Sequence, residues 1–227
     1  RPQQISPNFD THKLFFLDRG ALNQTVDSNA GPYSTIGLVA VASFAAIDPI
    51  LSGFREKTRR AALVDAVIYA ETLSIAWGLT NLAKVTVRRP RPSAYIAANA
   101  HKGDPTYDNS DTDSSLGFFS GHAAICASVT ATATYLAFAR SPGTARPWIT
   151  LIAGTLLTSF VAVERVRAGA HFPTDVIAGS LAGAGVGILV PHLHREDTVK
   201  QRAVWIGFAP TTGPNGEGGL ATLSGLF

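Results

Sequence analysis

Five long apolar segments constrain the fold of this chain more than any other feature of its sequence. They cover residues 33–51, 61–87, 120–140, 147–167 and 173–193. Each segment is too long for a typical strand. Proline, glycine or charged residues lie at most of the segment ends. The sequence therefore predicts an all-α protein, a helical bundle of about five to six core helices.

Polar segments flank and interrupt this bundle. Residues 1–32 are mixed and polar, and we expect an irregular N-terminal arm with a short helix. Residues 93–117 form a loop rich in Asp, Asn, Ser and Gly, and within it Asp104, Asp108, Asp111 and Asp113 suit a solvated loop better than a metal site. Two apolar runs, 203–208 and 220–227, flank a Gly-rich turn and predict a C-terminal β-hairpin.

The length of 227 residues fits one domain with a sizeable core. We divide residues 1–227 into the arm (1–32), a helical core (33–195) and the hairpin (203–227). Pro49 is expected to stop the first helix. Small residues such as Gly179, Gly183 and Gly185 would let the last helix approach its neighbours closely.

The apolar segments raise the question of whether they cross a bilayer, which needs about 20 largely apolar residues. Residues 114–139 and 147–163 contain no Asp, Glu, Lys or Arg, but Asp48, Asp65 and Glu71 interrupt the first two long helices. Each acid costs about 2.5–3.5 kcal/mol at mid-membrane on insertion scales. The mean hydropathy is only +0.16. We therefore favour a soluble or peripheral bundle and keep an integral membrane protein as the alternative.

Charge and cysteine content exclude two classes of protein. A net charge of +3 is too small to indicate a nucleic-acid binder. The single cysteine, Cys126, excludes an intrachain disulfide and a cysteine-rich metal site. The chain begins at Arg1 and contains no Met, so we expect a processed product from which a signal peptide could have been removed.

The residues between the last two long segments form the first candidate site. Pro173 can take the first position of a helix, which leaves His171 just outside the helix and Asp175 in its first turn. Asp175 could then accept a proton from one ring nitrogen while the other nitrogen acts as a nucleophile. Arg165 would bring a planar cation suited to phosphate oxygens. The alternative is a capped helix start without catalytic function.

A second candidate is Ser120-Gly121-His122, at the start of another helix. Ser120 suits the N-cap, and the free backbone N–H groups of a helix start bind anions. His122 would lie in the first turn, where an imidazole could protonate a leaving oxygen. The alternative is an ordinary serine cap beside an incidental histidine.

A third candidate is the basic end of the helix predicted for residues 61–87. Lys84 and Arg88 are one helical turn apart, and Arg91 follows between two prolines. Cations gathered in this way are expected around an anion of charge near −2. The alternatives are a solvated basic helix end or a contact with anionic lipid.

Together these stretches resemble the type 2 phosphatidic acid phosphatase superfamily, which includes lipid phosphate phosphatases, bacterial class A acid phosphatases and vanadium haloperoxidases. The matching motifs, in chain order, are Lys84-x6-Arg91-Pro92, Ser120-Gly121-His122 and Arg165-x5-His171-x3-Asp175. The motifs span residues 84–175, and the helix pattern extends the resemblance over most of 33–193. It implies that the helix ends converge on one active site.

The resemblance implies a metal-free phosphatase acting on phosphomonoesters or diphosphates. His171 would attack phosphorus and form a phosphohistidine, Asp175 would orient His171, and His122 would protonate the leaving oxygen and then activate water. The phosphate oxygens would be held by the residues Lys84, Arg91, Ser120, Gly121 and Arg165. No cofactor is implied, and vanadate is expected to bind as a phosphate mimic.

Two positions depart from the family pattern: Phe119 stands where proline is usual, and Glu164 where serine is usual. We expect Glu164 to pair with Arg165 or Arg88. Two other functions stay open, a vanadium-dependent haloperoxidase and a noncatalytic module that binds anionic lipid through Lys84, Arg88, Arg89 and Arg91.

The sequence also gives expectations for partners and location. Lipid phosphates or polyprenyl diphosphates are the favoured substrates, soluble phosphomonoesters stay open, and a membrane surface is a candidate partner. We expect no nucleic acid partner and a periplasmic or extracytoplasmic location, with membrane association open. The sequence does not indicate an oligomeric state.

Overall fold

The computed structural model describes residues 10–102, 104, 107, 112–195, 204–213 and 216–225. Six α-helices dominate, which confirms the predicted helical bundle. They are α1 (Ala30–Arg55), α2 (Arg59–Val87), α3 (Pro92–Ala100), α4 (Gly121–Arg140), α5 (Arg146–Arg167) and α6 (Pro173–Leu193). Three short 3₁₀ helices, η1 (Thr11–Lys13), η2 (Arg19–Leu22) and η3 (Asp113–Ser115), lie in the connecting segments.

Where the sequence led us to expect one domain, the structure divides the chain into two compact units, Arg1–Val190 and Pro191–Phe227. The second unit includes β1 (Val204–Gly213) and β2 (Gly216–Gly225), two antiparallel strands in which Val204 lies opposite Gly225. None of the candidate site residues lies in this unit.

Two predicted boundaries are wrong. Helix α1 continues through Pro49 to Arg55, because a proline inside a helix removes one backbone hydrogen bond without ending the helix when packing compensates. Pro49 is buried in that helix. The segment 93–117, expected to be a loop, begins with α3, in which Pro92 at the start precedes a run of alanines.

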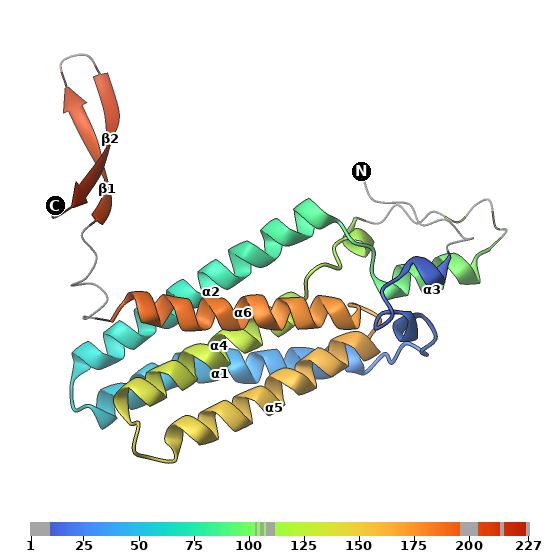
Figure 1. Cartoon of the computed structure of the whole chain (residues 1–227), viewed down its shortest axis with the longest axis horizontal. Helices are drawn as coiled ribbons and strands as arrows, with labels where there is room; N and C mark the ends of the chain where they lie inside the picture. Colours follow the sequence, from blue (N-terminus) through green and yellow to red (C-terminus); the bar gives the residue numbers. More distant parts are fainter. Residues whose placement is uncertain are drawn as a thin grey trace. The chain divides into compact units, whose positions relative to one another are not determined.

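Helix α4 forms the centre of the bundle. Its apolar stretch is 61% buried, against 17–39% for the other four long helices. Cys126, Val129, Ala133 and Leu136 of α4 belong to one core cluster to which α1, α2, α5 and α6 also contribute. Figure 1 shows α1, α2, α5 and α6 running alongside α4.

Helix α6 packs directly on the backbone of α4 through a row of glycines. A Cβ atom at Gly179 would lie 2.6 Å from the Ser120 carbonyl oxygen, and Cβ atoms at Gly183 and Gly187 would overlap the carbonyl oxygens of Ala124 and Ser128. The row therefore has a spacing of four residues and continues to Gly187. Gly185, which we expected to belong to it, has nothing within 4 Å of its Cβ position.

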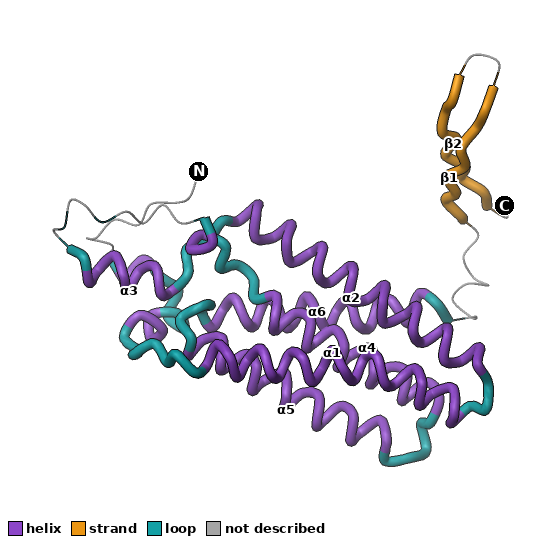
Figure 2. The backbone as a smooth tube through the Cα atoms, turned by 180° about the vertical axis from the view of Figure 1, so that it is seen from behind, coloured by secondary structure: helices purple, strands orange, loops and turns teal. Residues whose placement is uncertain are grey.

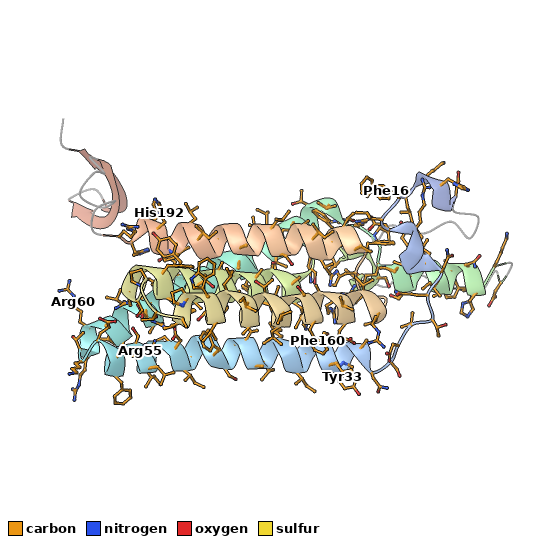
Figure 3. The ribbon with its side chains drawn as sticks, turned by 60° about the horizontal axis from the view of Figure 1, so that its bottom comes forward. Phe16, Tyr33, Arg55, Arg60, Phe160 and His192 are labelled. Carbon is orange, nitrogen blue, oxygen red and sulfur yellow. The ribbon has the colours of Figure 1, made fainter. Side chains whose placement is uncertain are left out.

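The outer helices turn large apolar side chains away from the core. Ile36 of α1, Trp77 of α2, Leu156 of α5 and Leu181 of α6 are 64–70% exposed. Five helical segments are long and apolar enough to cross a membrane; the second begins with α2 and continues through α3. Figure 3 shows side chains directed outward along the length of the helices. This arrangement indicates a membrane-associated protein, so of the predicted soluble or peripheral bundle it disfavours the soluble form.

Two of the three acids that argued against membrane spans, Asp48 and Asp65, are paired. The Asp48 carboxylate accepts hydrogen bonds from Arg55 (2.8 Å), Arg146 (3.3 Å) and the Tyr69 hydroxyl (3.0 Å), and Asp65 pairs with Arg140. Their positions near the end of α1 and the start of α2 place both acids at one end of the bundle. Paired acids near a helix end cost far less than the isolated mid-membrane acids that we assumed.

The up-and-down connectivity brings four helix termini to the opposite end of the bundle. The end of α2, the start of α4, the end of α5 and the start of α6 meet there, and Figure 2 shows loops joining the helices at both ends. All three sequence motifs lie at these termini.

Candidate active site

Backbone hydrogen bonds join the three motifs at this end of the bundle. The Gly117 N–H donates to the Arg89 carbonyl (2.8 Å), and the Ser120 N–H donates to the Asp175 carbonyl (3.1 Å). The Ser93 N–H donates to the Gly169 carbonyl (2.9 Å), where Gly169 adopts a positive φ of 64°. Segments as far apart in sequence as residues 93 and 169 are thus held in fixed register.

His171 is buried, with only 1% of its surface exposed. Its Nδ1 lies 2.6 Å from the Gly117 carbonyl oxygen. Because a carbonyl can only accept, Nδ1 carries the proton and Nε2 has a free lone pair. The ring is therefore held in the tautomer that a nucleophilic imidazole requires.

Three cations surround the two histidines. Burial, together with the positive charges of Arg165, Arg91 and Lys84, holds the pKa of His171 well below its usual value, so the ring stays neutral. The same three side chains are close enough to His122 to interact with it electrostatically. The structure thus brings together Lys84, Arg91, His122, Arg165 and His171, as the sequence predicted.

The cations keep hydrogen-bonding capacity for a ligand. Arg91 pairs with Asp113 through Nη2 (2.8 Å), but its buried Nε has no hydrogen-bond partner among the described residues. The same holds for the Nε of Arg165 and for Nε2 of His122. Buried polar nitrogens of this kind are costly unless a ligand or water satisfies them, so this cluster of side chains is suited to an oxyanion.

Ser120 and Gly121 lie at the predicted helix start. Ser120 is fully buried, and its hydroxyl caps α4 by accepting from the Ala123 N–H at 3.4 Å. Gly121 is the first residue of α4 and packs against Thr80, whose methyl carbon would lie 3.1 Å from a Cβ there. The positive end of the α4 dipole therefore faces the same end of the bundle as the cations.

The expected contact between Asp175 and His171 is wrong. The Asp175 carboxylate instead accepts from Arg89 Nη1 (2.6 Å) and from the Phe172 N–H (2.8 Å), and the Gly117 carbonyl takes the place predicted for Asp175 at His171. The sequence could not reveal this, because a backbone carbonyl from a distant loop has no signature in the sequence.

The predicted partner of Glu164 is also wrong. Glu164 is buried and accepts from Arg167 Nη1 at 2.8 Å, rather than from Arg165 or Arg88. Arg88 is exposed and donates to the Val85 carbonyl of its own helix end. The Nε of Arg165 is left without a hydrogen-bond partner among the described residues.

Sequence reasoning missed three residues beside the site. Asp18 of the N-terminal arm, which is fully buried, forms an ion pair of 2.7 Å with the partly buried Arg89, and Asp113, taken as part of a solvated loop, pairs with Arg91. An arm before the first long helix gives no sequence signal for such a contact. Asp108 and Asp111 of the same loop lie outside the described residues.

The comparisons with known proteins agree with this geometry. The family model of the PAP2 superfamily matches residues 65–198, more than half of the chain. No curated protein matches the sequence. Among solved structures, the chain is similar to a transmembrane PAP2-type phosphatidylglycerolphosphate phosphatase from Bacillus subtilis, with a TM-score of 0.55 and 20% identity. The match covers 82% of this chain and 85% of the other, and at this identity it concerns the fold. The chain belongs to the PAP2 superfamily.

Proposed function

We propose that this protein is a metal-independent phosphatase that hydrolyses lipid phosphomonoesters or diphosphates through a phosphohistidine on His171. The observation that carries the proposal is the convergence of two histidines and three cations on one pocket, with His171 held neutral. A pocket rich in unpaired donors suits the charge that develops on the equatorial oxygens during phosphoryl transfer.

In the first step, His171 Nε2 attacks phosphorus. The P–N bond forms as the bond from phosphorus to the leaving oxygen breaks, and His122 gives its proton to that oxygen. In the second step, His122 takes a proton from water, the water oxygen attacks phosphorus, and the P–N bond breaks. Inorganic phosphate leaves, and both imidazoles return to their starting state.

The remaining residues would hold the transferred group. Lys84, Arg91 and Arg165 would bind the equatorial oxygens, helped by the N-terminus of α4 at Ser120 and Gly121. Asp175 would contribute through the position of the α6 start, since its carboxylate contacts Arg89 and the Phe172 N–H.

A lipid substrate is favoured by the apolar surface of the helices. The site lies at one end of segments suited to span a bilayer, where a lipid headgroup would meet it. The similar solved structure is, by its own description, a phosphatidylglycerolphosphate phosphatase.

An extracytoplasmic site is favoured by the basic residues at the other end. The end of α1, the start of α2 and the turn between them carry Arg55, Lys57, Arg59 and Arg60, and Figure 3 shows Arg55 and Arg60 at the end opposite to Tyr33. An excess of Lys and Arg in short loops marks the cytoplasmic side of a membrane protein.

The test is release of inorganic phosphate from phosphatidic acid in detergent micelles, with a chelator present. The wild type should be active and inhibited by vanadate, and His171→Ala should lose at least about 10³-fold in kcat/KM, because it removes the nucleophile. His101→Ala, which changes an exposed histidine beyond α3, is the matched control and should stay within about twofold.

Other outcomes would favour the alternatives. Full activity of His171→Ala would refute the phosphohistidine. Halide oxidation with vanadate and peroxide, without phosphate release, would favour a haloperoxidase. If the wild type hydrolyses no phosphate ester but binds anionic vesicles, a noncatalytic lipid-binding module would be the better description, although the pairing of Arg89 with Asp18 and Asp175 removes one of its four cations.

A further inference from the structure

The N-terminal arm before α1 is fastened to the loop that carries His171. Gln24 Nε2 donates to the Val166 carbonyl (2.6 Å), and the Asp27 N–H donates to the Arg167 carbonyl (3.0 Å). At the other side of the loop, the Thr174 N–H donates to Asp18 Oδ1 (3.0 Å). The arm therefore contacts the chain both before and after the nucleophile.

Asp18 is the innermost contact of this arm. It is fully buried, and its Oδ2 accepts from the Thr174 hydroxyl (2.7 Å) and from Arg89 Nη2 (2.7 Å). Although Asp18 precedes the short helix η2, its side chain makes no capping hydrogen bond there. A buried carboxylate is retained only when charged or polar partners compensate for its lost hydration, and here these partners come from residues 89 and 174.

Arg89 connects Asp18 to the residues that follow His171 and to the loop that contacts the His171 ring. Its Nη1 donates to Asp175 Oδ1 (2.6 Å) and to the Thr174 hydroxyl (2.7 Å), and its guanidinium carbon lies 4.4 Å from the centre of the Phe172 ring. Its backbone carbonyl accepts from the Gly117 N–H (2.8 Å), and the Gly117 carbonyl is the partner of His171 Nδ1. One arginine thus fixes the residues after His171 and the loop that orients its ring.

We propose that Asp18 is a positioning residue for His171, acting through Arg89 and Thr174. The inference rests on the proposed phosphatase function for its kinetic consequence. Asp18 touches neither phosphate nor either imidazole. It holds the Arg89 guanidinium and the first turn of α6, so that the His171 ring keeps its hydrogen bond to Gly117 and its free Nε2 faces the pocket.

The first test compares Asp18→Asn with Asp27→Asn, in the full-length protein. Asp27 also joins the arm to the bundle, through an ion pair with Arg167 (2.7 Å), but it is more exposed and does not contact the start of α6. For Asp18→Asn we expect kcat to fall by about tenfold or more, with KM within about twofold, because misplacing a reacting group by about 1 Å costs up to 10²-fold in rate. Asp27→Asn should keep its kcat within about twofold.

The second test does not depend on activity. Nitrogen NMR of ¹⁵N-histidine-labelled protein reports which ring nitrogen of His171 carries the proton. The wild type should show protonated Nδ1, and Asp18→Asn should change this signal, whereas Asp27→Asn should not. Arg89→Lys keeps the positive charge but loses the guanidinium group that donates to Asp18 and Asp175 at once. It should therefore reproduce both effects of Asp18→Asn. If Asp18→Asn does not fold, Arg89→Lys serves as the test of the positioning role.

The results separate two kinds of failure. Unchanged kcat and an unchanged His171 signal in Asp18→Asn would overturn the positioning role. Equal losses of kcat and melting temperature in Asp18→Asn and Asp27→Asn would also overturn it, because the arm would then only stabilise the fold. If the wild type releases no phosphate, the proposed function fails, and the His171 signal alone decides whether Asp18 positions the ring.

Discussion

His171 combines two features that rarely occur together, a buried imidazole and three nearby cations. Both lower its pKa, burial more than the charges, while the hydrogen bond to Gly117 acts in the opposite direction. A histidine in this setting is neutral in the folded protein at pH values where it would be charged in the unfolded chain. This difference links its protonation to stability.

The pH dependence of stability should therefore carry a contribution from His171. In the unfolded chain the imidazole has a pKa of about 6.5, so below about pH 6.5 the unfolded state binds a proton that the folded state does not. Stability is then lost as pH falls. Between about pH 7.5 and pH 5.5, the melting temperature in detergent should drop more for the wild type than for His171→Gln.

An exposed histidine supplies the comparison. His12→Gln changes an exposed side chain of the N-terminal arm and should keep the pH dependence of the wild type. An equal drop in melting temperature between the two pH values for His171→Gln and the wild type would contradict a neutral, buried His171.

At this scale the sequence predicted which residues meet but not all of their contacts. Lys84, Arg91, His122, Arg165 and His171 were found because each stands in a motif at a helix boundary. The contacts of Asp175 and Glu164 were predicted wrongly, since a carboxylate takes whichever donor the fold brings nearest. Asp18 was missed because no local pattern marks an arm residue that binds a distant arginine.

The packing of α6 on α4 sets the distance between the two motifs that these helices carry. Gly183 has no room for a side chain, since a Cβ would overlap the Ala124 carbonyl oxygen, while Gly185 faces open space. Ser120 and His122 lie at the start of α4, and Asp175 lies in the first turn of α6. Any separation of these helices must widen the pocket.

Gly183→Ala should therefore destabilise the protein by about 1–3 kcal/mol and reduce phosphate release, because the helices must move apart. Gly185→Ala is the matched control on the same helix. It should be neutral or stabilising by up to about 1 kcal/mol, because alanine favours a helix more than glycine does. Thermal unfolding in detergent measures both, and a Gly183→Ala variant as stable as Gly185→Ala would refute the close packing.

Helix existence was easier to predict than helix boundaries. The five long apolar segments all became helices, because length and composition suffice for that. The continuation of α1 through Pro49 depends on packing, and the formation of α3 depends on a favourable first residue, Pro92. The positions of helix-breaking residues in the sequence do not reveal either effect.

For the whole molecule, the orientation in the membrane can be tested by labelling introduced cysteines, because the chain has a single native cysteine. Cys126 is the single cysteine and is buried, so an introduced cysteine is the only thiol that a reagent can readily reach. Lys102 follows α3 at the site end, and Gly143 lies in the connection between α4 and α5 at the other end; both are exposed.

A membrane-impermeant maleimide should label Lys102→Cys in intact cells and label Gly143→Cys only after lysis. This result follows if the site is extracytoplasmic, as we propose. The Cys126-only parent should stay unlabelled in both conditions. Labelling of Gly143→Cys alone in intact cells would reverse the orientation, and labelling of both would argue against a spanning bundle.

The sequence underestimated membrane association because each acid was treated as isolated. Asp48 and Asp65 are paired near one end of the bundle, and only three-dimensional packing shows where their partners lie. The outward apolar faces were likewise invisible, since composition does not tell which side of a helix is covered.

The enclosure of α4 has a consequence for how the surroundings reach the pocket. When the thickness of a bilayer differs from the apolar length of a helix, the helix tilts, at a modest energetic cost for each ångström of the difference. Helix α4 is largely shielded from contact with lipid by its four neighbours. A thinner or thicker bilayer thus acts first on α1, α2, α5 and α6. Ser120 and His122 at the start of α4 are displaced only when those neighbouring helices move.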